Sequence, residues 1–172
     1  SFNYSETFKQ SFKIFILYLV LTIFLFFLLK LINIRTFDAF NLAMTIISSG
    51  GFLPVNDIQN IINTDFKEIF FSFLMLFSFF SLFLIYNIFF LKQRSINFFA
   101  EDIYLFFYFF FLLIIFFVFF NFDYNFSTIL FSLTSSMSNI GISLNNSPTN
   151  LWFILLIIVI IGGSFFSTSS GI

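Results

Sequence analysis

Two short stretches of small and polar residues interrupt the chain at matching places between long apolar runs. The first covers residues 45–52 and the second residues 136–143. An apolar segment precedes each stretch and is too short to cross a bilayer, since a spanning helix needs about 20 apolar residues. The pattern predicts two re-entrant loops, each entered through a half-helix, at residues 38–47 and 126–137.

Longer apolar runs flank both units. They cover residues 12–32, 69–91 and 103–120, and a fourth run opens at residues 151–161. The order is therefore span, half-helix, loop and span, twice over. We expect an all-α membrane protein with one repeat in residues 12–91 and a second in residues 103–172, whose last span is truncated. Residues 1–11 would form a cytoplasmic or interfacial lead-in, and residues 92–102 a cytoplasmic link.

Polar residues mark where the half-helices are expected to begin. Thr36 is the expected N-cap of the first, with Asp38 in the first turn, where the helix dipole favours a carboxylate. Asn125 or Ser127 can cap the second. The segments after the loops contain Pro and Asn, and we expect them to return to the surface in extended form at residues 53–62 and 143–150.

Composition places most of this chain in lipid. The 172 residues are 60% hydrophobic and only 9% charged, whereas soluble domains have about 25% charged residues. The 37 Phe residues are read as generic lipid-facing side chains. No Cys or His is present, which excludes disulfides, thiolate or imidazole metal ligands and Ser-His or Cys-His catalysis. We therefore expect no enzyme, and the net charge of -1 gives no indication of nucleic-acid binding.

Charged residues are expected at the membrane surfaces. All eight acidic residues fall at predicted span ends, at a half-helix start or in loops, where solvated carboxylates are the simplest interpretation. Basic residues in the short flanks set the orientation. One face would carry Lys9, Lys13, Lys92 and Arg94. This places residues 1–11 and 92–102 in the cytoplasm and opens both loops to the outside of a multi-pass protein of the cytoplasmic membrane.

The two loops suit a monovalent cation that has shed its water. Such an ion needs several oxygen ligands, and rings of backbone carbonyls supply them. Glycine favours this role because it has no Cβ and tolerates positive φ, and each half-helix points the partial negative charge of its C-terminus at the loop. The candidate K⁺-binding residues are Ser48, Ser49, Gly50, Gly51, Ser138, Asn139, Ile140 and Gly141. The alternative for Gly50 and Gly51 is a simple C-cap and turn.

The last apolar run breaks into a stretch of small polar residues. Its small and polar members are Gly162, Gly163, Ser164, Ser167, Thr168, Ser169, Ser170 and Gly171. We interpret the stretch as a locally unwound helix below the loops, where it could act as a gate. Two alternatives are a small-residue face for close helix packing and the end of a helix.

Several motifs resemble the membrane subunits of Trk- and Ktr-type potassium uptake proteins, TrkH and KtrB. Residues 37–40 (FDAF) lead into residues 48–52 (SSGGF) and then residues 56–57 (ND), as in the family's pore loop. Residues 161–172 are similar to the family's IGG-SAGST-GGGIK stretch, and residues 138–142 stand where its TTTGF is expected. The motifs occur in the family's order and spacing, and the resemblance covers most of the chain from about residue 12 onward.

This resemblance implies a potassium channel-like transporter with four span–half-helix–span repeats around a single selectivity filter. The chain would be a fragment that corresponds to the second and third repeats, or two half-length chains would pair. Gly51 and Gly141 would be filter glycines, and residues 162–171 an intramembrane gating loop. The implied partners are the remaining repeats of the same protein, a second membrane subunit in a homodimer, the lipid bilayer, and a cytoplasmic nucleotide-binding subunit similar to TrkA or KtrA. K⁺ would be the transported ion, and no covalently bound cofactor is expected.

The chain departs from the family's pattern at both motifs. In the second loop Asn139 and Ile140 replace two threonines and Ile142 replaces a phenylalanine, which bears on the selectivity of that quarter of the filter. In the last motif residues 165–166 are Phe-Phe instead of Ala-Gly, and residues 169–170 are Ser-Ser instead of Gly-Gly. These larger side chains imply a bulkier gate.

Two other functions were weighed against cation transport. A non-conducting membrane scaffold or assembly subunit would use the small-residue stretches as packing faces. A membrane enzyme has little support, because no acid, base or nucleophile constellation stands at membrane depth.

Overall fold

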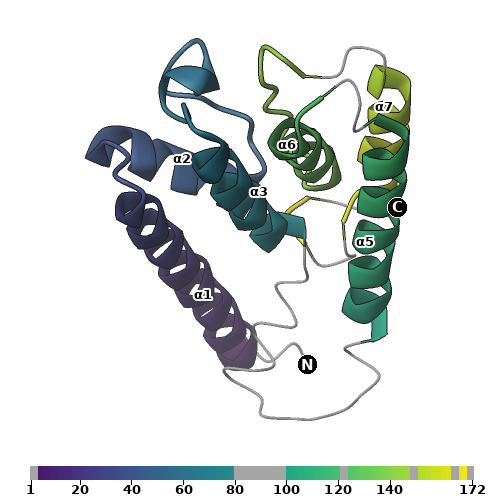
Figure 1. Ribbon diagram of the computed structural model, residues 1–172. Coiled ribbons are helices and arrows are strands. Elements are labelled where there is room, and N and C mark those ends of the chain that lie inside the picture. The colour runs from purple at the N-terminus through teal and green to yellow at the C-terminus, as the bar shows by residue number, and fades with distance from the viewer. Residues whose placement is uncertain (1–3, 80–99, 121–123, 148–150, 164–166, 170–172) are drawn as a thin grey trace.

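All the regular elements that the structure, a computed structural model, describes are helices. It describes residues 4–79, 100–120, 124–147, 151–163 and 167–169. In chain order the elements are α1 (Tyr4–Leu31), α2 (Thr36–Ser48), η1 (Ile58–Asn60), α3 (Asp65–Phe79), α5 (Ala100–Phe120), α6 (Phe126–Met137) and α7 (Trp152–Ile161) (Figure 1). The expected all-α class is confirmed for these residues.

Helices α3 and α6 pack against each other and lie at the centre of the arrangement. α1 packs on α2, which also contacts α3, while α5 and α7 both pack on α6. Figure 1 accordingly shows α1 and α2 on one side of the central pair and α5 and α7 on the other. The elements of the first expected repeat thus meet those of the second through the central pair.

Aromatic side chains fill the contact between the central helices. Phe71 of α3 and Phe131 of α6 are fully buried. Their rings stack with centroids 5.9 Å apart and an interplanar angle of 16°. On α3 the neighbouring Phe73 points away from this contact and is 55% exposed. One face of α3 therefore packs into the core and another is exposed, as the helical period requires.

Replacing Phe71 by alanine should destabilise the protein by about 3–5 kcal/mol, because the deletion leaves a cavity between two packed helices. Thermal unfolding in detergent micelles measures the loss. Phe73→Ala removes the same atoms from the exposed face of α3 and should change stability by less than about 0.5 kcal/mol. Equal effects of the two substitutions would contradict the central position of the Phe71–Phe131 pair.

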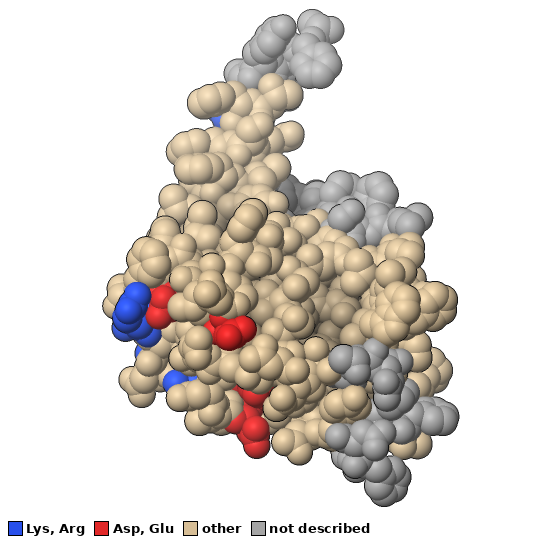
Figure 2. Space-filling view, turned by 90° about the horizontal axis from the view of Figure 1, so that it is seen from above, with Lys and Arg blue, Asp and Glu red and all other residues tan. Residues whose placement is uncertain are grey.

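The outer faces of the helices are apolar. On α5 the side chains of Tyr104, Phe107, Phe111, Ile114 and Val118 are between 59% and 74% exposed. On α7 the exposed side chains include Trp152, Phe153 and Ile160. Figure 2 shows the charged side chains of one face gathered over part of that face, with a wide uncharged surface beside them.

One described helix is long and apolar enough to cross a membrane, by length and composition. It comprises residues Thr7–Leu31 of α1. Three shorter apolar helices are Ile103–Val118, Phe126–Met137 and Trp152–Ile161. The spans and repeats expected from the sequence otherwise stay predictions, and residues 80–91 of the second expected span lie outside the described residues.

Some element boundaries differ from expectation. α1 begins at Tyr4 rather than at residue 12, so the polar residues of the expected lead-in are helical from Tyr4 onward. The N-cap of α2 is Arg35 rather than Thr36, and its side chain forms no capping bond. Thr36 instead accepts a hydrogen bond from Lys30 Nζ at 3.2 Å. The first return segment, expected to be extended, contains the 3₁₀ turn η1.

Candidate functional site

The end of α2 leads directly into a tight loop, residues 49–52, called loop 1 below. Ser49 has left-handed backbone angles, φ 48° and ψ 37°. Its N–H donates to the Ile46 carbonyl at 3.2 Å, and the Gly50 N–H donates to the Thr45 carbonyl at 3.1 Å. These bonds satisfy carbonyls that a helix C-terminus otherwise leaves unpaired. The cap residue is therefore Ser49 rather than Gly50, while the alternative of a C-cap and turn for this stretch stays open.

The end of α6 leads into a second loop, residues 139–142, called loop 2 below. Asn139 has a φ of 54°. Its N–H donates to the Ser136 carbonyl at 3.2 Å, and the Ile140 N–H donates to the Ser135 carbonyl at 3.2 Å. Asparagine tolerates this left-handed conformation better than most residues. Loop 2 therefore closes its helix with the same pair of hydrogen bonds as loop 1.

The two loops also match at the residue two positions after Ser49 and Asn139, which is a glycine with positive φ in both. Gly51 has a φ of 67° and Gly141 a φ of 74°. Each loop thus alternates a left-handed residue, an ordinary one and a left-handed glycine, at positions ninety residues apart in the sequence. The weak sequence echo thus coincides with a matching pattern of positive φ angles in the two loops.

Loops 1 and 2 also touch. A Cβ placed on Gly51 would lie 2.5 Å from the carbonyl oxygen of Ile140 and 3.7 Å from its carbonyl carbon. The Ile140 carbonyl oxygen therefore occupies the space that a side chain at Gly51 would need, and no residue larger than glycine fits there. A Cβ on Gly141 would meet nothing within 4 Å among the described residues.

No family model, curated protein or solved structure matches this chain. Its role is therefore inferred from the two loops and from what surrounds them.

The other candidate ion-binding residues lie at the helix ends. Ser48 is the last residue of α2, is exposed, and donates its hydroxyl to the Met44 carbonyl at 2.8 Å. Ser138 caps α6, is fully buried, and lies 3.3 Å from the Ser135 carbonyl through its hydroxyl. The Ile140 side chain is buried in the core, so this residue offers its carbonyl to the loops.

The small-residue segment, meaning Gly162, Gly163 and residues 167–169, lies against the C-terminal end of α3 and against both loops (Figure 1). Helix α7 ends at Gly162, which has a φ of 67°. The N–H of Ser169 donates to the Ser78 carbonyl of α3 at 3.2 Å. A Cβ on Gly163 would lie 2.6 Å from the Phe79 carbonyl oxygen. Ser164, Ser170 and Gly171 of the expected gate lie outside the described residues.

Each loop contacts the small-residue segment through its first left-handed residue. The Asn139 amide nitrogen donates to the Ser169 carbonyl at 2.5 Å, and the Ser49 hydroxyl donates to the Thr168 hydroxyl at 3.4 Å. The amide oxygen of Asn139 is buried without a hydrogen-bond partner among the described residues. The structure thus brings together all three stretches that the sequence singled out.

Sequence reasoning missed two hydroxyl groups that bind the loops from within the half-helices. The Thr45 hydroxyl donates to the Phe52 carbonyl. The Ser135 hydroxyl donates to the Ile142 carbonyl at 2.6 Å. The available signal was positional, because each hydroxyl residue precedes the loop glycine, Gly51 or Gly141, by six positions.

Asp38 differs from the solvated acids expected at helix starts. Only 8% of this residue is exposed, although it lies in the first turn of α2. One carboxylate oxygen is 3.5 Å from Arg35 Nε, and the other is buried without a partner among the described residues. The N-terminal end of the helix dipole favours a carboxylate at this position. Asp38 lies at the opposite end of α2 from loop 1.

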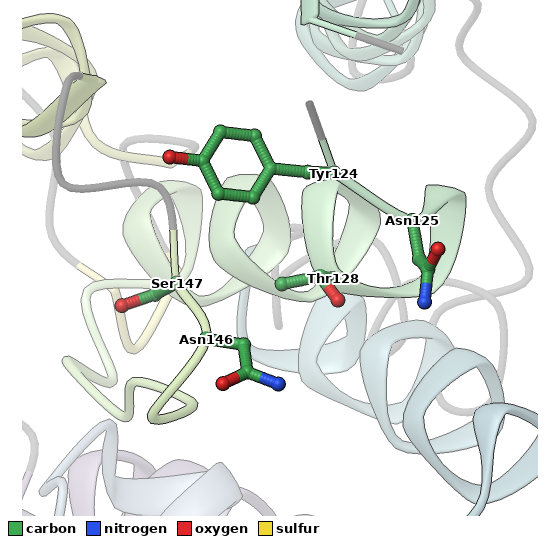
Figure 3. A pocket seen from close by; sticks show the side chains of 5 residues that line it. All are labelled: Tyr124, Asn125, Thr128, Asn146 and Ser147. Carbon is green, nitrogen blue, oxygen red and sulfur yellow. The ribbon is translucent and has the colours of Figure 1, made fainter. Parts of the chain in front are cut away.

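No group of three His, Cys, Asp or Glu in the described ranges could hold a metal ion through side chains. A pocket of about 380 Å³ lies instead at the N-terminal end of α6, away from loop 2. Figure 3 shows the polar side chains that line it, Tyr124, Asn125, Thr128, Asn146 and Ser147. These are uncharged, and none was a candidate site residue.

Proposed function

We propose that this chain forms part of a membrane pore that conducts monovalent cations, K⁺ or both Na⁺ and K⁺, with loops 1 and 2 as two of its ion-coordinating loops. One observation carries the proposal. Two half-helices end in loops with the same pattern of positive φ angles and the same closing hydrogen bonds, and the Ile140 carbonyl oxygen of one loop packs against Gly51 of the other. Carbonyl-lined loops brought side by side supply the oxygen ligands that a dehydrated monovalent cation needs.

The surface of the molecule supports a lipid environment. Large apolar side chains are exposed along α1, α5 and α7, and only 9% of the chain is charged. Irregular backbone at membrane depth leaves unpaired polar groups that are costly in hydrocarbon, so it persists where it is buried in protein or lines a water-filled path. Loops 1 and 2 satisfy this condition if they lie inside a pore.

The open side of loop 2 leaves room for further loops. Gly51 of loop 1 is covered by loop 2, whereas the matching Gly141 meets nothing within 4 Å in the described part of the chain. We propose that additional repeats complete the ring, as the resemblance to TrkH and KtrB implies. That resemblance also supports a homodimer in the cytoplasmic membrane with a nucleotide-binding regulatory subunit on its cytoplasmic face, and loops that open outward.

The small-residue segment is proposed as the gate of this pore. It contacts loop 1 through Thr168 and loop 2 through Ser169, and α3 through the Ser78 carbonyl. A few hydroxyl and amide hydrogen bonds are worth little each in net free energy, so a segment held in this way can separate from the loops without unfolding the helices.

Cation flux through the full-length protein in proteoliposomes tests the function. Vesicles that contain the protein should take up K⁺ faster than empty vesicles, in a saturable manner, and should exclude choline. Comparison of K⁺ with Na⁺ uptake then gives the selectivity. Folded protein that conducts neither ion, both alone and with its cytoplasmic nucleotide-binding partner, would overturn the pore and favour a membrane scaffold.

A further inference from the structure

Several hydroxyl groups of the half-helices donate to backbone carbonyls, and they do so in two different directions along the chain. Those of Ser48, Ser132, Thr134 and Ser136 donate to the carbonyl four residues earlier in their own helix, at 2.8 to 2.9 Å. Serine and threonine inside a helix ordinarily bond backward in this way. Thr45 and Ser135 instead donate forward, across seven residues, to the carbonyls of Phe52 and Ile142.

These two forward bonds are equivalent in the two repeats. Thr45 and Ser135 are each 3% exposed, so water competes little for their hydroxyls. Each accepting carbonyl belongs to the residue directly after a left-handed glycine, Gly51 or Gly141. The same contact therefore forms twice, from different residue types, at the same place in both loops.

One residue in each repeat binds both ends of its loop. The Thr45 carbonyl accepts the Gly50 N–H at 3.1 Å, while the Thr45 hydroxyl binds the Phe52 carbonyl. In the second repeat Ser135 does the same for Ile140 and Ile142, at 3.2 Å and 2.6 Å. Each loop therefore cannot move away from its half-helix as a whole without breaking a bond to this buried helix residue.

We propose that Thr45 and Ser135 are positioning residues that determine the K⁺ over Na⁺ selectivity of the pore, an inference that rests on the proposed cation transport. They hold the loop carbonyls in a fixed ring, so that a smaller ion cannot draw them inward. Where selectivity comes from the size of the carbonyl ring, it depends on how far the carbonyls can move. Loss of the hydroxyl frees one end of the loop and lets it adapt to Na⁺.

The test compares hydroxyl deletions in the full-length protein by the ratio of K⁺ to Na⁺ uptake in proteoliposomes. Thr45→Val and Ser135→Ala should each lower this ratio by about tenfold, the factor that corresponds to one net hydrogen bond, while K⁺ uptake itself persists. Thr45→Ser retains the donor and should restore the ratio. Thr134→Val and Ser132→Ala remove hydroxyls that bond backward within α6 and should leave the ratio unchanged.

Each outcome separates this inference from the function on which it rests. Wild-type protein that passes neither ion fails as a pore, whatever its hydroxyls do. Wild-type protein that prefers K⁺, with variants that retain the same preference, overturns the role of Thr45 and Ser135 alone. A ratio that falls equally in Thr134→Val would assign the effect to general packing of the helix and would also overturn it. Should Thr45→Val fail to fold, Ser135→Ala decides by the same criterion.

Discussion

Replacing Gly51 by alanine is expected to abolish cation uptake, with a loss of at least about a hundredfold. The added Cβ would lie 2.5 Å from the Ile140 carbonyl oxygen, a backbone atom that cannot rotate away. The φ of 67° adds strain of about 1–3 kcal/mol for a residue other than glycine. Together these effects exceed the roughly 2.8 kcal/mol that corresponds to a hundredfold change. Uptake of K⁺ into cells that lack their own potassium uptake measures the loss.

Gly50→Ala is the matched control for that experiment. A Cβ on Gly50 meets the Ser48 hydroxyl at 2.9 Å and the Phe52 ring at 3.1 Å, both side-chain atoms that can turn away. Uptake should therefore stay within about threefold of wild type, as expected for a change that costs well under 1 kcal/mol. A Gly51→Ala protein that conducts as well as the Gly50→Ala protein would show that loop 1 does not line the ion path.

Replacing Gly163 by alanine is expected to act in the opposite direction and raise basal uptake about tenfold. The added Cβ would lie 2.1 Å from the Ser169 hydroxyl oxygen and 2.6 Å from the Phe79 carbonyl oxygen. Since that carbonyl belongs to α3, the small-residue segment must move, and its hydrogen bonds to Ser78 and Asn139 weaken. Loss of one net hydrogen bond shifts the balance between open and closed states by about this factor. Initial rates of K⁺ entry at equal protein content measure it.

Asn139→Gly provides an independent check on the gate. Glycine accepts the φ of 54° without strain, so the substitution removes the hydrogen bond to Ser169 and leaves the backbone of loop 2 in place. Basal uptake should rise as it does for Gly163→Ala. Should both variants fold and conduct no faster than wild type, the segment is a packing element rather than a gate.

The fold was predictable where polar residues stand at both ends of an apolar run. α6 covers the predicted residues 126–137, and α2 extends the predicted half-helix by two residues at its start and one at its end. The beginning of α1 was not predictable in the same way, because polar residues that face outward continue a helix as readily as they form a surface segment. The turn η1 depends on tertiary packing of the buried Ile58 and Ile62, which local sequence does not reveal.

The candidate site was predictable to the level of residues but not of contacts. Gly51 and Gly141 stand out as small residues between apolar runs, and both adopt the left-handed conformation that favours glycine. The hydrogen bonds from Thr45 and Ser135 to the loop carbonyls could not be predicted, since a hydroxyl within an apolar helix ordinarily bonds to its own helix. The approach of Ile140 to Gly51 depends on how α3 packs against α6, and no pattern within either repeat specifies that packing.

The contact between the loops has a direction, and this direction restricts how an assembly can close. Loop 1 contributes its glycine and loop 2 contributes the carbonyl of the residue before its own glycine, so the joint is heterologous, head to tail. Such joints form closed rings when the rotation between successive units divides a full turn, and open chains when it does not. No carbonyl lies against Gly141 among the described residues. In the proposed ring a further loop would supply one, whereas a two-fold pairing of Gly141 against Gly141 would leave both glycines without one.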